Sequence, residues 1–235
     1  MTVSIVERNA EQVTIQIQIP LSSAFLLESE ETIQTVLNEA GTVASGEALK
    51  QFDTDGSALE IGGEKWTSKG KMAKTYQTPY GAVEVHRHVY QSRYGGATFY
   101  SLEVDGRIII TFTPQCAKQI SHKYGEMSSP RLVEDLQENH GRSVHRSFVQ
   151  TLAEAVGSIA LLKAENWHYQ TPKLAVPIAT VSIGVDGTCL LLCEGGFRQA
   201  MVGTISLYDE EGERQHTTYV AASPEYGRAT FLERM

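Results

Sequence analysis

The spacing of apolar residues changes period several times along this chain, and these changes limit the fold more than any other feature. Apolar and polar residues alternate over 13–19, which is typical of a half-buried strand. Helical spacing runs over 30–49, and a strand-rich block with turn signals follows over 61–113. Helical spacing returns over 114–166, and three further strands are indicated over 179–221. Because strands and helices fall in separate blocks, the sequence predicts an α+β fold with a β-rich N-terminal region.

Charge is distributed just as unevenly. The 235 residues include 20 Lys and Arg and 28 Asp and Glu, for a net charge of −8. Residues 1–64 have a net charge of −9, residues 65–146 of +5 and residues 147–235 of −4. A polyanion would therefore be attracted only to the middle block. Together with the apolar spacing, this predicts an acidic strand–helix segment over 1–64, a basic β-rich region over 65–113 and a helical segment over 114–170.

The basic β-rich region mixes cationic with aromatic side chains. Its strand over 83–90 places His86 and His88 on one face, where they could bind a metal, contact phosphate or face solvent. The mixture suits contact with a nucleic-acid backbone, although a basic sheet without any ligand has the same pattern. The candidate phosphate-contacting residues are Lys65, Lys69, Lys71, Lys74 and Arg87.

Three helices are indicated within 114–166. Pro130 predicts the start of the second helix and Gly141 its end. Ser143 is predicted to cap the third helix, so the link between the two has the short spacing of a helix-turn-helix. The exposed N-terminal end of the third helix would then present Arg142, His145, Arg146 and Gln150 to base edges. Any packed cluster of three helices gives similar spacing, so packing without DNA contact is the alternative.

The cysteines and the N-terminus bear on the compartment. Three cysteines, Cys116, Cys189 and Cys193, leave at least one unpaired, which favours a reducing environment. No second Cys or His pair lies near Cys189 and Cys193 to complete a zinc site. The first ten residues include Glu7 and Arg8 where a signal peptide would be apolar, and no apolar stretch approaches the ~20 residues that span a bilayer. We therefore expect a cytoplasmic protein with no membrane partner.

One acidic residue, Asp186, interrupts the apolar run over 181–192. An ionised carboxylate is costly there unless it is paired, hydrogen-bonded or bound to a metal. Asp186-Gly187 is also a typical two-residue hairpin turn, although turn signals at 194–196 and 209–212 already divide the region. The pattern alone leaves both a turn and a functional carboxylate on a strand open.

Five segments carry a family resemblance: 46–63 (GEALKQFDTDGSALEIGG), 74–90 (KTYQTPYGAVEVHRHVY), 183–193 (IGVDGTCLLLC), 198–208 (RQAMVGTISLY) and 212–222 (GERQHTTYVAA). They resemble the N-terminal part of ISKra-type insertion-sequence transposases, which are similar to Mutator-like elements. The resemblance implies an enzyme that binds, cuts and rejoins DNA at terminal inverted repeats. It also implies that a ribonuclease H-like catalytic domain begins over 171–235, in which three acidic residues hold two Mg²⁺ ions. The first of these acids corresponds to Asp186.

The same resemblance implies that part of this catalytic domain is missing. The family's second and third acids follow the helix that begins near Pro224, whereas the chain ends at Met235. Four acidic residues between Asp186 and that helix cluster in a polar turn and do not replace them: Asp209, Glu210, Glu211 and Glu213. Because Asp186 alone cannot position two metal ions, we expect a truncated and catalytically inactive transposase.

Two alternatives from other functional classes remain open. One is a non-catalytic protein that uses residues 65–166 to bind DNA or to form a homo-oligomer. The other is a β-rich binding module that has no nucleic-acid partner.

Overall fold

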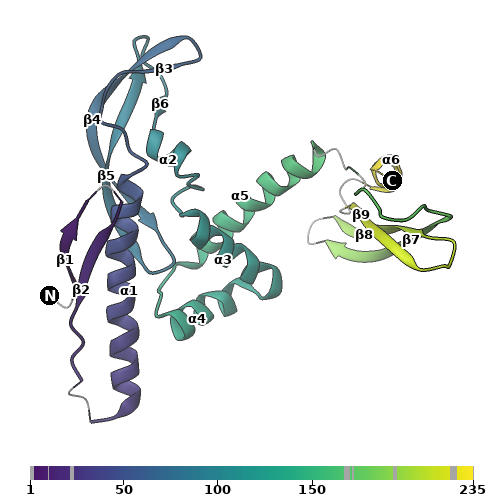
Figure 1. The fold of residues 1–235 in the computed structure, drawn as a ribbon, viewed down its shortest axis with the longest axis horizontal. Coiled ribbons are helices and arrows are strands. Elements are labelled where there is room, and N and C mark those ends of the chain that lie inside the picture. Colours follow the sequence, from purple (N-terminus) through teal and green to yellow (C-terminus); the bar gives the residue numbers. More distant parts are fainter. Residues whose placement is uncertain are drawn as a thin grey trace. The chain divides into compact units, whose positions relative to one another are not determined.

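The computed structural model describes residues 3–9, 11–21, 24–166, 170, 172–192, 195–222 and 227–234. The chain divides into two compact units, Met1–Trp167 and His168–Met235. Helices and antiparallel sheets are both prominent, so the α+β prediction is confirmed (Figure 1).

The first unit begins with a hairpin and a long helix. Strand β1 (Val3–Arg8) pairs with β2 (Val13–Ile17), and helix α1 (Leu26–Lys50) follows. The predicted strand and helix are confirmed, but α1 begins four residues before the predicted helical spacing, directly after Phe25.

Two glycines that would weaken an isolated helix lie where α1 packs on the sheet. A Cβ on Gly41 would overlap the ring of Tyr80, and a Cβ on Gly46 would lie 2.9 Å from Val83. Gly46 is buried, as are Val36, Ala40 and Leu49. The glycines therefore allow a closer approach of helix to sheet than alanine would, which offsets their low helix propensity of about 1 kcal/mol each.

The main sheet of this unit has the order β3-β4-β5-β6 and is antiparallel throughout. It consists of β3 (Leu59–Ile61), β4 (Glu64–Gln77), β5 (Ala82–Ser92) and β6 (Thr98–Phe99). The short helix α2 (Ser101–Asp105) follows β6. One face of the sheet is packed by a buried cluster. It consists of Tyr76 and Val85 from the sheet, Leu49 from α1 and Leu102 from α2.

Three helices complete the first unit: α3 (Pro114–Glu126), α4 (Ser129–His140) and α5 (Arg146–Glu165). They share a core that includes Phe112, Ile120, Leu132, Leu136 and Leu152. Proline stands in the first turn of both α3 and α4, and Gly141 ends α4 in the left-handed conformation with φ 60°, as predicted. The helical segment is therefore confirmed as a packed cluster.

The predicted short link between the second and third helices is wrong. Helix α5 begins at Arg146 with His145 as its cap, so an extended link of five residues separates it from α4. Arg142 and Val144 in this link are both buried, and an extended chain turns alternate side chains to the same side. Arg146 Nε donates to Ser129 Oγ at 2.9 Å, so α5 starts beside the start of α4 rather than against its end.

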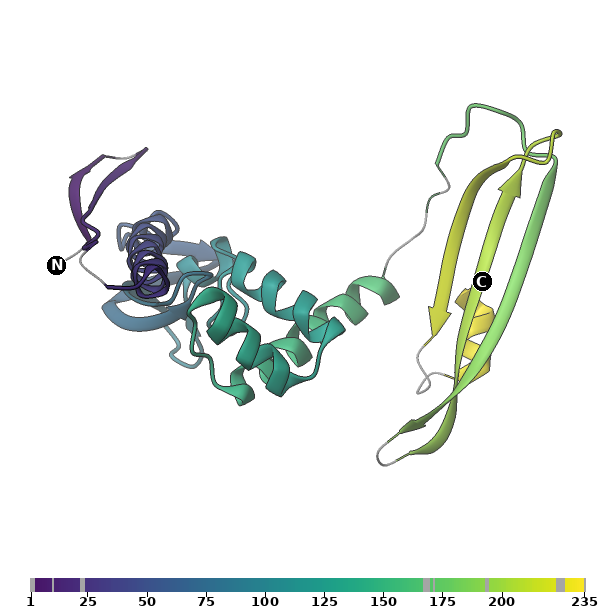
Figure 2. The same cartoon turned by 90° about the horizontal axis from the view of Figure 1, so that it is seen from below.

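The second unit is a three-stranded antiparallel sheet of order β7-β8-β9, seen at the right of Figure 2. Its strands are β7 (Thr180–Leu192), β8 (Gly196–Tyr208) and β9 (Arg214–Ala222), and α6 (Gly227–Arg234) packs on β8 and β9. Met201, Ala222 and Phe231 form its buried cluster. The three predicted strands are confirmed, whereas Cys193, Glu194, Pro224 and Met235 lie outside the described residues.

Arg87 was predicted to contact phosphate, but its side chain belongs to the interior of the first unit. It is 5% exposed, its guanidinium lies 3.8 Å from the ring centre of Tyr100, and its Nη2 lies 3.0 Å from Glu103 Oε1. The Tyr76 hydroxyl donates to the same carboxylate oxygen at 3.0 Å, and burial raises the pKa of Tyr76. The prediction for Arg87 is wrong because a partner 16 residues away draws it inward.

Replacing Arg87 should therefore destabilise the first unit. Arg87→Ala leaves the Glu103 carboxylate and the Tyr76 hydroxyl without their cation, and we expect a loss of about 2–4 kcal/mol in the free energy of unfolding. Arg87→Lys should recover only part of it, because an ammonium cannot reproduce the planar stacking on Tyr100. Urea unfolding followed by circular dichroism measures the loss. Lys69→Ala, on the exposed part of β4, is the control, and an equal loss in both variants would contradict the assignment.

Candidate nucleic-acid interface

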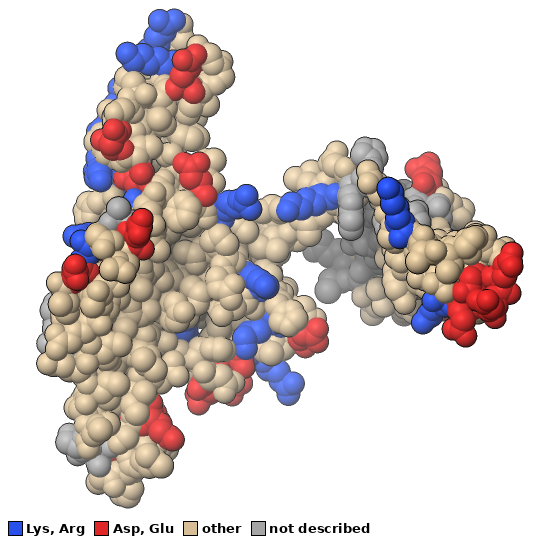
Figure 3. Space-filling view, in the orientation of Figure 1, with Lys and Arg blue, Asp and Glu red and all other residues tan. Residues whose placement is uncertain are grey.

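The four lysines predicted to contact phosphate all lie on β4, but they do not share one face. A β-bulge shifts the register between Ser68 and Lys71, where Gly70 has φ 101°. Lys65 precedes the bulge and Lys74 follows it, and the pairing with β5 places both on the face opposite to that of Lys71. Figure 3 shows blue side chains over the β3–β5 end of the unit, with red ones among them. The structure therefore spreads these cations around the strand.

Local partners further divide these lysines. Lys71 Nζ lies 3.6 Å from a carboxylate oxygen of Asp53, whose side chain is nearly buried. Lys74 is half-buried, whereas Lys65 and Lys69 are exposed. Within the described chain Lys65 and Lys69 have no ion-pair partner, so they are the lysines of β4 most available to an anion.

The two histidines of β5 have different surroundings. His86 is exposed, whereas His88 Nδ1 lies 2.7 Å from Ser68 Oγ and its backbone N–H donates to Asp53. Gly56 packs on the His88 ring so closely that a Cβ there would lie 2.6 Å from it. Among the residues with described positions, no group of three His, Cys, Asp or Glu side chains could hold a metal. His88 therefore supports the loop that contains Asp53 and Gly56.

The start of α5 presents three of the four residues predicted there. His145, Arg146 and Gln150 are exposed. His145 Nδ1 accepts a hydrogen bond from the Ser147 backbone N–H, and Gln150 Nε2 donates to Glu154 Oε1 at 3.2 Å. These contacts are local to the helix and leave the side chains at the surface.

A further cation that the sequence analysis did not single out is Arg131, which is exposed in the first turn of α4. The bond from Arg146 to Ser129 brings the first turns of α4 and α5 together, and with them Arg131. The positive ends of two helix dipoles add to these cations. Arg131 could have been noticed in the sequence, because it follows Pro130 directly, at a helix start where an acidic residue is usually favoured.

The exposed position predicted for Arg142 is wrong. Its side chain is 4% exposed, with Nη1 3.6 Å from Cys116 Sγ and Nη2 3.2 Å from Gln77 Oε1. Burial raises the pKa of the Cys116 thiol, and the neighbouring guanidinium opposes part of that effect. Arg142 thus joins the end of β4 to the start of α3 and does not reach the surface where DNA would bind.

Asp186 lies in the middle of β7, opposite Val202 of β8, so the structure favours the strand and excludes the hairpin turn. Its side chain is exposed, and Oδ1 accepts the N–H of Gly187 at 2.7 Å. The paired residues place Asp186 on the face opposite to Met201, which packs toward α6. The carboxylate therefore costs little where it stands.

The described residues around Asp186 do not fit a site for two Mg²⁺ ions. The acidic cluster predicted to be a solvated loop forms the turn between β8 and β9, away from the middle of β7. Asp209 in that turn is buried and accepts from the N–H groups of Glu211 and Glu213 and from Gln215 Nε2. Its carboxylate fixes the turn. No cleavage step follows from the carboxylates that the structure describes near Asp186.

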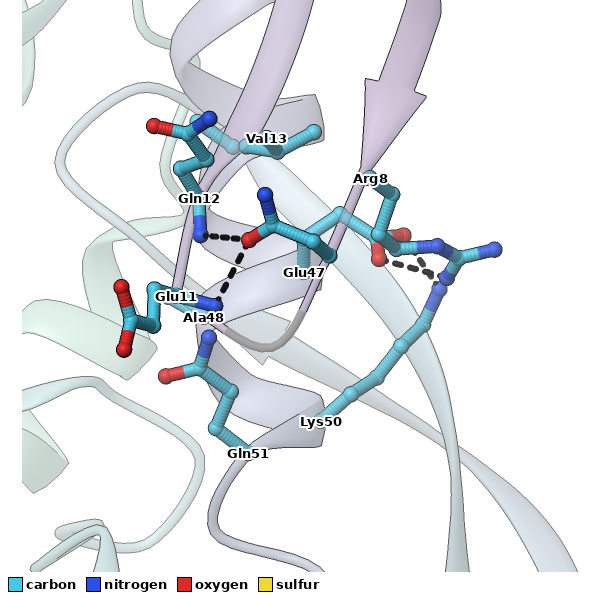
Figure 4. Close-up of a pocket in the computed structure, with 10 residues that line it drawn as sticks. Arg8, Glu11, Gln12, Val13, Glu47, Ala48, Lys50 and Gln51 are labelled. Carbon is cyan, nitrogen blue, oxygen red and sulfur yellow. Dashed lines mark hydrogen bonds and ion pairs between the residues drawn. The ribbon is translucent and has the colours of Figure 1, made fainter.

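A cavity of about 410 Å³ lies between the β1–β2 turn and α1 (Figure 4). Glu47 dominates it, with Oε2 2.7 Å from Arg8 Nη1 and Oε1 2.6 Å from Lys50 Nζ. Asn9 Oδ1 accepts the N–H groups of Glu11 and Gln12. These polar groups therefore satisfy one another. The ion pair of Glu47 with Arg8 joins the hairpin to α1, and we call the cluster of Arg8, Glu47 and Lys50 the clasp.

The described helices include none that is both long and apolar enough to cross a membrane.

The strand position of Asp186 leads to a test with valine. Valine suits an exposed edge strand but not the positive φ of a tight turn. We expect Asp186→Val to leave the free energy of unfolding within about 1 kcal/mol of wild type, or to raise it, in thermal unfolding followed by circular dichroism. Asp186→Asn keeps an oxygen for the Gly187 N–H and is the matched control. Pronounced destabilisation by valine alone would indicate a turn.

The clasp at Glu47 should depend on pH. The hydrogen bond from Lys50 holds the pKa of Glu47 below its ordinary value of 4.5, with a smaller effect of Arg8 and an opposing effect of burial. The stability that this carboxylate contributes is therefore complete above pH 4.5 and is lost as the pH falls through the lowered pKa. The protection factors of the β1 and β2 amides, which correct for the pH dependence of intrinsic exchange, should fall over that range. In the Glu47→Gln variant the same amides should exchange faster than in wild type at neutral pH, and their protection should no longer change as the pH falls.

Comparison with known proteins adds no further assignment: the chain matches no protein-family model and no curated protein.

Proposed function

We propose that the unit over 1–167 binds duplex DNA and that the chain is part of a transposase of the ISKra type that acts at terminal inverted repeats. The observation that carries the proposal is the placement of its exposed cations. Lys65 and Lys69 project from β4, and Arg131 and Arg146 gather at the adjoining starts of α4 and α5. Arg87 and Arg142 do not contribute to this surface, because contacts with Glu103 and Gln77 hold their side chains in the interior.

The arrangement suits a phosphate backbone for electrostatic reasons. Most of the acidic excess of the first unit lies in residues 1–64, so the basic block is not neutralised within its own sequence. Lysine and arginine side chains at a surface bind phosphates by displacing condensed counterions, which gives affinity without base specificity. The exposed Gln150 and His145 beside Arg146 are suited to hydrogen bonds with base edges. In this proposal α3, α4 and α5 serve as the helix-turn-helix-like part of the unit, despite their longer link.

The second unit supports the transposase part of the proposal. Three antiparallel strands in sequence order, with an acidic residue in the middle of the first, agree with the start of a ribonuclease H-like domain. In the full family Asp186 would be the first of three acids that hold Mg²⁺. The proposal assigns DNA binding, and no cleavage step, to this chain, since none of the described residues brings a second carboxylate to Asp186.

The test is the affinity for a fluorescein-labelled duplex, measured by anisotropy over a range of salt concentrations. One duplex carries the end repeats of an ISKra-type element and another has a scrambled sequence. We expect Lys65→Glu with Lys69→Glu, and Arg131→Glu with Arg146→Glu, each to weaken binding about tenfold or more at low salt. Each pair should lower the slope of log affinity against log salt by about 2.

Lys173→Glu is the matched control, because Lys173 is exposed but lies outside the first unit. Equal affinity of all variants, or binding that does not respond to salt, would refute the proposed interface. A preference for the end-repeat duplex would support the transposase assignment, whereas equal binding to both duplexes would favour a DNA-binding protein without that specificity.

A further inference from the structure

A groove of about 870 Å³ runs between the segment after α2 and the helices α3 and α5. Its walls are largely apolar and include Val104, Ile108, Val156 and Ile159, of which Val104 and Ile159 are exposed. A monomeric protein rarely leaves large aliphatic side chains together at its surface without a use. The groove therefore has the composition of a docking surface for an apolar group.

Three cations surround this apolar groove: Arg107, Lys118 and Lys163. All three are exposed, and they have no ion-pair partner in the part of the chain that the structure describes. Glu103 also lines the groove, but its carboxylate is bound to Arg87 and Tyr76 and does not neutralise the rim. An apolar floor with a cationic rim is complementary to an amphipathic acidic helix, whereas a phosphate backbone gains nothing from the floor.

The same chain carries such a helix end. Leu26 and Leu27 in the first turn of α1 are 74% and 65% exposed. Glu28, Glu30 and Glu31 surround them, are exposed, and form no ion pair with any described residue. A helix end of this composition is costly to leave in water and presents both of the features that the groove would recognise.

We propose that the start of α1 in one copy docks in the groove of a second copy. The leucines would occupy the apolar floor, and the three glutamates would face the cationic rim. Figure 1 places the first turn of α1 at the end of the unit remote from α2, so one chain does not fill its own groove. This inference is independent of DNA binding, because it uses neither β4 nor the starts of α4 and α5.

The geometry determines the kind of assembly. Two different surfaces meet in this contact, so it is heterologous, and each added copy leaves one groove and one helix end open. A single helix end buries less than the ~1,200–2,000 Å² of a stable interface, which corresponds to a weak association. We therefore expect open, concentration-dependent oligomers rather than a closed dimer of fixed size.

Sedimentation velocity over a wide range of protein concentration tests the association. The wild-type weight-average mass should rise continuously with concentration, and added salt should reduce it. Leu26→Glu with Leu27→Glu should remove the rise, and so should Lys118→Glu with Lys163→Glu. Leu162→Glu and Lys173→Glu are matched controls on exposed residues outside the groove, and they should behave as wild type.

Mixing the two disabled proteins distinguishes this contact from any other. The leucine variant keeps an intact groove and the lysine variant keeps an intact helix end, so together they should form a one-to-one complex and nothing larger. Circular dichroism establishes that each variant is folded, and Leu26→Gln with Leu27→Gln replaces the first pair if it is not. A wild-type protein that stays monomeric, association that persists in both variants, or a mixture that stays monomeric would each overturn the proposal.

Discussion

The buried guanidinium of Arg142 links the two halves of the first unit, and much of the remaining geometry depends on it. It binds Gln77 at the end of β4 and Cys116 near the start of α3, both through neutral groups. A buried cation without a carboxylate is tolerated only where its hydrogen bonds are well placed. The backbone reinforces this junction, because Gln77 donates to Thr111 and accepts from Thr113. Together these contacts fix how the sheet meets the helical cluster.

The position of Arg142 also decides where α5 begins. Because Arg142 and Val144 both face inward, the link after Gly141 stays extended and returns along α4. The start of α5 is thereby placed beside the start of α4, which gathers Arg131 and Arg146 in one region of the surface. The exposed Arg131 and Arg146 therefore lie close together because Arg142 is buried.

Patterns of period two and of helical period were sufficient to predict the longer strands and helices, but not β1 or the short helix α2. The resemblance, and not the pattern, favoured a strand around Asp186. The inward position of Arg87 and Arg142 was not predictable in this way. Arg87 is held by Glu103 and Arg142 by Gln77, which are 16 and 65 residues away, and composition does not distinguish a solvated arginine from one with a distant partner. The faces of the β4 lysines were not predicted, and simple alternation would have put Lys65 and Lys71 on the same face. A single bulge at Gly70 reverses the alternation that a simple strand would have.

The glycines of α1 tie the order of that helix to the sheet. Gly41 and Gly46 lower the intrinsic stability of the helical turns that contact Tyr80 and Val83. The packing of these turns on Tyr80 and Val83 offsets that loss of stability. Helix and sheet therefore form one cooperative unit: when the sheet opens, the C-terminal half of α1 has too little propensity to persist alone. Substituting alanine to strengthen the helix would force it away from the sheet and loosen the whole unit instead.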